Sequence, residues 1–306
     1  QWQKSFGGTD TDIGTSIKQT NDSGYIFLGA TISVDGDVIG NHGNYDAWLV
    51  KLDKSGNIQW QKCLGGSSGE FARTIEITPD SGYVIGGVAN SNDGDVSGEH
   101  GLQDIWIVKV DMNGNIQWQK CLGGSQTDGP PGLAFNSGNP QRISICLTSD
   151  GGYFIGSTST SIDGDVTGHH GPGGLVTTGG SSHLDSDYWV IKLDNAGALQ
   201  WQKSLGGTDQ DWAFSVLATN DKGYIVVGNT ASTDGDVSGT LGVGLHSWIV
   251  KLDSVGIIKW QKLIGATGIQ SWTHHISKTN DGNFFLTGKY GAQAWVYKMD
   301  GAGSIQ

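Results

Sequence analysis

"WIVKVDMNGNIQWQKCLGG", residues 106–124, decides the fold, because close copies of it recur along the whole chain. Its Trp-Gln-Lys triplet occurs five times, beginning at Trp2, Trp60, Trp118, Trp201 and Trp260. Self-similarity at a nearly regular spacing indicates an architecture built from repeated supersecondary units.

Each repeat contains four strand signals, which the second repeat displays clearly. They begin "ARTIEIT" at Ala72, "GYVIGGVA" at Gly82, "IWIVKVD" at Ile105 and "NIQWQKCL" at Asn115. In the last of these, apolar and polar residues alternate as they do in a half-buried strand. No segment has the 3.6-residue apolar period of a helix, so we expect an all-β chain.

The turns inside each repeat have the same chemistry in every copy. An Asp-x-x-Gly turn joins the third and fourth strands, with Asp capping and Gly in the left-handed conformation. The five copies are Asp53/Gly56, Asp111/Gly114, Asp194/Gly197, Asp253/Gly256 and Asp300/Gly303. A second aspartate begins the turn between the first and second strands, at Asp22, Asp80, Asp150, Asp221 and Asp281.

Five four-stranded antiparallel repeats predict a single five-bladed β-propeller domain spanning residues 1–306. The chain ends on "GSIQ" and begins with "QWQK", so we expect the N-terminal strand to complete the last blade and close the ring. The expected blades cover residues 12–64, 70–122, 140–205, 211–264, and 271–306 completed by 1–6.

Composition excludes several classes of partner. The net charge of −12 and pI near 4.9 argue against nucleic acid, because phosphate binding needs clustered Lys and Arg. No apolar run is long enough for membrane insertion. Because the chain opens with Gln1 rather than Met, we expect a leader or further domains to have been removed. Cys63 and Cys121 occupy the same place in successive repeats, which favours small buried side chains over a disulfide.

The hairpin "WIVKVDMNGNIQWQKCLGG" resembles the tryptophan-docking blades of PQQ-type propellers, in which a Trp packs onto the next blade. The whole repeat, with "DGDVSG" and "WIVKLD", is similar to tandem-repeat propellers of secreted and cell-surface bacterial proteins. This resemblance covers nearly the entire chain and implies a secreted or surface location. It implies no quinone cofactor, because no matching cofactor constellation is present.

One rim of the expected ring carries the irregular loops. It is formed by the connections between second and third strands and by those that lead into the next blade. Two insertions in the third repeat, residues 128–141 and 169–185, fall on this rim. Binding sites are commonly built from loops on a rigid scaffold, so we place the functional face there.

An Asp-Gly-Asp-Val loop on this rim recurs in four repeats. Carboxylates two residues apart around a glycine are compatible with Ca²⁺, although no downstream bidentate Glu is present. A plain Asx-turn and direct ligand contact are the two alternatives. The possible Ca²⁺ ligands are Asp35, Asp37, Asp93, Asp95, Asp163, Asp165, Asp234 and Asp236.

A histidine follows the Asp-Gly-Asp loop in three repeats, each with an aspartate two residues before the third-strand Trp. The pairs are His42 with Asp46, His100 with Asp104, and His170 with Asp187. The fourth repeat has lost both together, with Leu241 and His246 in their places. This joint loss predicts that the histidine and the aspartate hydrogen-bond one another and hold the loop.

Trp212 and Trp272 are the two tryptophans outside the repeat pattern, and they begin first strands beside the functional rim. Exposed Trp commonly stacks on sugar rings. The alternative is packing between blades, because Phe71 stands at the same place in the second repeat. Asp12, Glu70 and Asp211 precede these positions, with Pro140 and Ser271 in the other two repeats.

These six residues, Trp212, Trp272, Phe71, Glu70, Asp211 and Asp12, are the candidate ligand-binding residues. A glycoside hydrolase needs two carboxylates in unlike environments, whereas a copied position supplies like ones. We therefore expect a non-enzymatic, carbohydrate-binding or adhesive module, a monomeric domain of a larger secreted or cell-surface protein. A scaffold that binds a surface protein is the alternative, and a glycoside hydrolase is the less favoured one.

Overall fold

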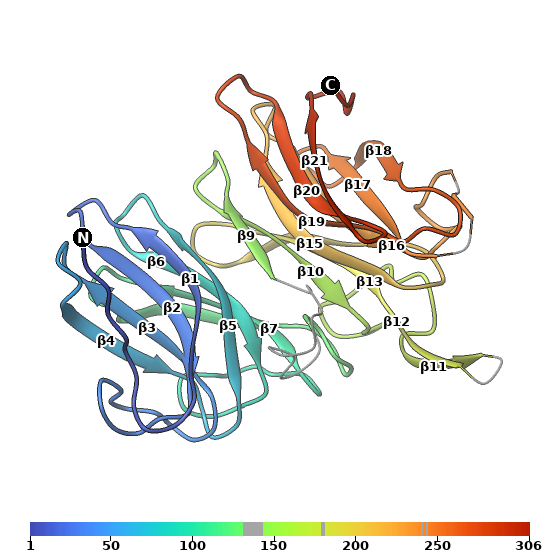
Figure 1. Ribbon diagram of the computed structural model, residues 1–306. Coiled ribbons are helices and arrows are strands. Elements are labelled where there is room, and N and C mark those ends of the chain that lie inside the picture. The colour runs from blue at the N-terminus through green and yellow to red at the C-terminus, as the bar shows by residue number, and fades with distance from the viewer. Residues whose placement is uncertain (131–142, 179–180, 240, 243) are drawn as a thin grey trace. The chain divides into compact units, whose positions relative to one another are not determined.

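The computed structural model describes residues 1–130, 143–178, 181–239, 241–242 and 244–306. Across these residues the chain forms β-strands and no helix, as the sequence predicts (Figure 1). The strands belong to two compact units, residues 1–123 and 124–306.

The first unit contains two four-stranded antiparallel sheets, each built from consecutive strands. The first sheet comprises β1 (Asp12–Gln19), β2 (Tyr25–Thr31), β3 (Asp46–Leu52) and β4 (Ile58–Leu64). The second comprises β5 (Glu70–Ile77), β6 (Tyr83–Ala89), β7 (Asp104–Val110) and β8 (Ile116–Leu122).

The second unit contains two more four-stranded sheets, a three-stranded sheet and a hairpin. The third sheet comprises β9 (Ser144–Leu147), β10 (Tyr153–Ser159), β13 (Asp187–Leu193) and β14 (Leu199–Leu205). The fourth comprises β15 (Asp211–Ala218), β16 (Tyr224–Thr230), β17 (His246–Leu252) and β18 (Ile258–Ile264). The fifth comprises β19 (Ser271–Lys278), β20 (Phe284–Tyr290) and β21 (Gln293–Met299), and the hairpin β11 (Gly174–Thr178) and β12 (Ser181–Asp185).

The repeated four-stranded sheets are consistent with a propeller-like fold, but two expectations about the ring are not met. The described residues form six sheets rather than five, because part of the third-repeat insertion pairs as the hairpin β11–β12. Residues 1–8 form no strand, and β21 is the last strand of a three-stranded sheet. Closure of five blades into a ring is therefore not confirmed.

The core of each unit lies between the consecutive sheets of that unit. Every residue of the middle strands β6 and β7 is buried, whereas β8 has the alternating exposure that its sequence predicts. Trp60 of the first sheet lies against Gly114 of the second, where an added Cβ would stand 2.9 Å from the indole ring. The same contact joins Trp2 to Gly56, Trp201 to Gly256 and Trp260 to Gly303.

The predicted turn chemistry is confirmed. Asp111 accepts hydrogen bonds from the backbone N–H groups of Asn113 (2.8 Å) and Asn115 (2.9 Å), and Gly114 has a φ of 79°. In the turn between β5 and β6, Asp80 accepts from the N–H of Gly82 at 3.1 Å. Asp80 also forms an ion pair at 2.9 Å with Lys109, a buried lysine that the sequence analysis did not single out.

That lysine pairing recurs in every repeat, from the third strand to the first turn. The further pairs are Lys51–Asp22, Lys192–Asp150, Lys251–Asp221 and Lys298–Asp281. Cys63 and Cys121 are buried and free, as expected. Nothing helical in the described part of the chain could cross a membrane.

Candidate functional site

The predicted histidine–aspartate bonds are present in all three repeats. Nδ1 of His42, His100 and His170 lies 2.7 Å from Oδ2 of Asp46, Asp104 and Asp187 respectively. The backbone N–H of each histidine also donates to the same oxygen at 3.1 Å. In each loop, the histidine is therefore anchored to a fully buried carboxylate at the start of the third strand.

His170 also connects consecutive sheets. Its Nε2 lies 3.4 Å from Oδ2 of Asp236, which belongs to the Asp-Gly-Asp loop of the fourth sheet. The loop of one sheet is thereby tied both to its own third strand, through Asp187, and to the neighbouring loop.

The candidate carboxylates at the start of the first strands are held by the loops that precede them. Glu70 is fully buried and accepts from the N–H groups of Gly66 (2.8 Å) and Ser91 (3.1 Å). Asp211 is equally buried and accepts from the N–H of Gly207 (2.9 Å). Burial raises the pKa of both carboxyl groups. These contacts are structural, and neither side chain is accessible to a ligand in this conformation.

Asp12 belongs to the same position but is only partly buried. It accepts from the N–H of Gly8 (2.8 Å) and from the hydroxyl of Ser33 (3.0 Å). In the third repeat the equivalent residue is Asp128, which accepts from the N–H of Gly124 at 2.7 Å. The sequence alignment that placed Pro140 there was wrong, because the insertion follows this position rather than preceding it. Residue 140 itself lies outside the described residues.

Two buried carboxylates face each other across a glycine between consecutive sheets. A Cβ on Gly65 would stand 2.6 Å from Oδ1 of Asp46 and 2.7 Å from Oε2 of Glu70. Asp187 and Asp211 flank Gly206 in the same way, each at 2.4 Å. Between the fourth and fifth sheets the flanking groups are instead Nδ1 of His246 and the hydroxyl of Ser271.

The Asp-Gly-Asp loops fold over the glycine pair of the preceding connection. Asp35 accepts from the N–H of Thr9 at 2.7 Å, and the N–H of Asp37 donates to the carbonyl of Gly7 at 3.0 Å. Asp93, Asp163 and Asp234 accept in the same way from Ser67, Ser125 and Thr208.

These bonds give the Asp-Gly-Asp loops a structural role. Among the described residues, no three His, Cys, Asp or Glu side chains are grouped so that they could hold a metal ion. The second aspartate of each Asp-Gly-Asp motif lies two residues later in the same loop, at Asp37, Asp95, Asp165 and Asp236.

The candidate aromatic residues of the second unit form a continuous aromatic ladder, which is defined here as Trp212, Phe214, Trp272 and His274. The rings of Trp212 and Trp272 are 5.9 Å apart, and that of Trp272 is stacked with Phe214 and His274 at 6.3 Å. Both indoles are partly exposed. Phe71, by contrast, is buried against Tyr45, with 5.0 Å between the ring centroids.

Sequence reasoning missed Phe214 and His274 because they occupy β-bulges. The pairing register shifts between Ala213 and Ser215, and again between Thr273 and His275. An extra residue at a bulge alters side-chain direction. The available signal was the Trp-x-aromatic spacing in "DWAF" and "SWTH".

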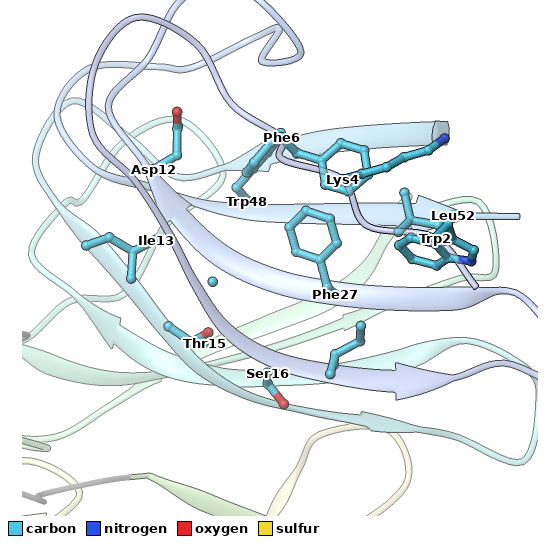
Figure 2. A pocket seen from close by; sticks show the side chains of 12 residues that line it. Trp2, Lys4, Phe6, Asp12, Ile13, Thr15, Ser16, Phe27, Trp48 and Leu52 are labelled. Carbon is cyan, nitrogen blue, oxygen red and sulfur yellow. The ribbon is translucent and has the colours of Figure 1, made fainter. Parts of the chain in front are cut away.

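An apolar groove of about 550 Å³ lies on the first sheet. Figure 2 shows Phe6, Phe27 and Trp48 gathered along it, with Trp2 and Lys4 at the side. Phe27 is 5.6 Å from Phe6 and 5.5 Å from Trp48. In the second sheet, the residues at the equivalent positions are buried in a core cluster that also contains residues of the first sheet.

The comparisons with known proteins assign the chain to no family. No family model matches it. Over 141 residues, 42% of this chain, it is 26% identical to the regulatory protein FlaEY of Caulobacter vibrioides, and the match spans 15% of that protein.

The similar solved structures are distant. One is a protein of unknown function from Bacteroides caccae, with 13% identity, a TM-score of 0.49, and coverage of 95% of this chain and 79% of that one. Another is a gluconolactonase from Xanthomonas campestris, with 10% identity, a TM-score of 0.42, and coverage of 98% and 76%.

Proposed function

We propose that this chain is a non-enzymatic, glycan-binding module of a secreted or cell-surface protein, and that Trp212 and Trp272 of the aromatic ladder contact the sugar. The observation that carries the proposal is the partly exposed pair Trp212 and Trp272. Phe214 is buried and stacks on Trp272, so it supports that ring rather than contacting the sugar. Large aromatic rings offer an apolar face and lose little conformational entropy on binding.

The chemistry of sugars fits such a surface. One face of a pyranose presents C–H groups that pack against an indole, while the hydroxyl groups remain hydrogen-bonded to water or to polar neighbours. Neighbouring rings on β15 and β19 offer successive platforms to more than one sugar unit. An oligosaccharide would therefore bind better than a monosaccharide.

A glycan-array screen followed by calorimetry tests the proposal. We expect Trp272→Ala to weaken binding of a bound oligosaccharide about tenfold or more, and Trp272→Phe to retain part of the affinity. Met112→Ala is the control, because Met112 is an exposed apolar residue in a turn of the first unit. Each assay is run with added Ca²⁺ and with a chelator, because the Asp-Gly-Asp loops hold the candidate ion ligands.

The alternatives predict different results from the same screen. If no glycan binds, or if Trp272→Ala binds as well as the native chain, the glycan proposal is wrong and a protein-binding scaffold is favoured. Turnover of a polysaccharide would contradict the non-enzymatic proposal. The equivalent burial and bonding of Glu70, Asp128 and Asp211 supports that part, because acid and base roles need unlike environments.

We also propose that the chain closes into a five-bladed ring, with residues 1–6 serving as the fourth strand of the fifth sheet. Two observations support this. Val296 of β21 is 65% exposed and Phe285 of β20 is 43% exposed, although the equivalent residues of the other sheets are buried. The groove beside Phe27 is likewise an apolar face of the first sheet. The equivalent face of the second sheet is covered by the first sheet.

A further inference from the structure

A second groove lies within the second unit, between the third and fourth sheets. It has a volume of about 640 Å³ and lies at the turns β9–β10 and β15–β16. Leu147, Ala218 and Tyr224 contribute its apolar surface, and Lys192, Lys222 and Asp150 its charged groups. The volume is in the range of small-molecule sites, and a mixture of apolar surface with a few polar groups is typical of them.

One small residue lines this groove where the second sheet has a large one. Ala218 ends β15 and pairs with Tyr224, as Ile77 ends β5 and pairs with Tyr83. Ile77 packs against the core between the first and second sheets, together with Trp60. Alanine lacks the three additional carbon atoms of isoleucine, so Ala218 fills less of the equivalent position between the third and fourth sheets.

Polar side-chain contacts join the first sheet to the second and the fourth to the fifth near the same turns. Apolar or weakly polar residues stand at the corresponding places between the third and fourth sheets. Lys18 and Glu76 form an ion pair at 2.7 Å between the first and second sheets. Lys278 donates to Asn220 between the fourth and fifth. The third and fourth sheets have Cys146 and Leu217 where Lys18 and Glu76 stand.

The groove carries a net positive charge within a strongly acidic chain. The ammonium of Lys192 lies 3.0 Å from the carboxylate of Asp150, so these two charges balance. Lys222 adds a further ammonium for which the described residues provide no ion pair. An anionic group of a ligand would therefore find one uncompensated cation here.

Lys222 also has an unusual backbone conformation. Its φ of 67° is left-handed, a region that costs a non-glycine residue about 1 kcal/mol or more. The same turn position holds Ser23 and Ser81 in the first unit, and Gly151 and Gly282 in the second. The fourth repeat therefore has a long charged side chain at a turn position where the other four repeats have serine or glycine.

We propose that this groove is a binding site for a small hydroxylated carboxylate of the hexuronate type. The carboxylate would pair with Lys222, and the C–H face of the ring would contact Leu147 and Ala218. Hydroxyl groups would meet the side chains of Gln200 and Asn220, which also line the groove. This site is separate from the aromatic ladder, and the inference does not depend on the proposed function.

Calorimetric or NMR titration of the full chain with D-glucuronate and D-galacturonate tests the inference, with D-glucose and D-galactose as neutral probes. We expect saturable binding of at least one uronate and weaker binding of its neutral counterpart. Lys222→Ser, which installs the residue of the first two repeats, should weaken uronate binding about tenfold, the effect of roughly 1.4 kcal/mol. Lys54→Ser removes an exposed lysine elsewhere and serves as the charge-matched control.

Ala218→Ile is the second variant, because it installs the residue that fills the equivalent space in the second sheet. We expect it to abolish uronate binding while the thermal unfolding temperature stays the same or rises. The inference is overturned if neither uronate binds, if neutral sugars bind equally well, or if Ala218→Ile binds as the native chain does.

Discussion

At the scale of single residues, the histidine–aspartate pairs hold the loops between the second and third strands of three sheets. Each aspartate is fully buried and receives two hydrogen bonds from one histidine. The fourth sheet provides a natural variant: His246 replaces the aspartate, and Ser271 replaces the second carboxylate across Gly265. At this place the histidine, its aspartate and the carboxylate across the glycine are thus all absent together.

His42→Ala and Asp46→Ala should each lower the free energy of unfolding by about 1–2 kcal/mol, because each removes a hydrogen bond to a charged or polar partner. We expect the double variant to be little worse than either single variant, since both remove the same interaction. Urea unfolding of the four proteins measures the coupling. If the double variant lost as much free energy of unfolding as the two single variants together, the hydrogen bond between His42 and Asp46 would be contradicted.

The buried carboxyl groups predict that stability falls as pH rises from about 5 to 8. Burial raises the pKa of Asp46 and Glu70, so the folded chain binds their protons more tightly than the unfolded chain does. Burial opposes protonation of His42, but the hydrogen bond to Asp46 and the nearby negative charges together outweigh this effect, so the pKa of His42 is raised. The raised pKa of His42 also makes the folded chain less stable as pH rises. The turn aspartates, such as Asp80 with a pKa lowered to about 2, are ionised throughout this range.

Thermal unfolding temperatures measured across this pH range test the direction. Glu70→Gln should reduce the slope, because one proton-binding group is removed. A melting temperature that rises steadily from pH 5 to pH 8 would contradict the prediction.

At the scale of elements, the strands and turns were predictable because their determinants are local. Alternation in "NIQWQK" and the Asp-x-x-Gly spacing act within a few residues, and the structure follows both. The bulges were not predictable: Thr15, Arg73, Phe214 and His274 occupy the same bulge position and share no side-chain property.

The site was predictable where repeats differ from one another in a correlated way. The joint loss in the fourth repeat was sufficient to infer the bond between His42 and Asp46. Burial of Glu70 and Asp211 could not be inferred, because it depends on the loop amides that enclose them. The sequence predicts a loop insertion where the hairpin β11–β12 forms, since its short, polar strands carry little apolar alternation.

At the scale of the whole molecule, ring closure can be tested by a cross-link. Leu49 pairs with Lys62 in the first sheet, and Val296 and Lys4 occupy the corresponding places in the fifth sheet and the N-terminal segment. We expect Lys4→Cys with Val296→Cys to form a disulfide within one chain under mild oxidation. Mass spectrometry and non-reducing electrophoresis detect it.

Lys120→Cys with Val296→Cys is the matched control, because Lys120 is the exposed equivalent of Lys4 on β8. The closed ring does not bring that pair together. Disulfides formed only between chains would contradict closure and indicate a head-to-tail assembly through the two apolar faces.

Burial of the native thiols has a consequence for the chain's covalent chemistry. Desolvation raises the pKa of Cys63 and of Cys121 to about 12, so only about one thiol in 10⁵ is a thiolate at pH 7. The thiolate is the species that attacks disulfides and oxidants. We therefore expect both thiols to react slowly with disulfides and oxidants while the chain is folded, whether its surroundings are oxidising or reducing.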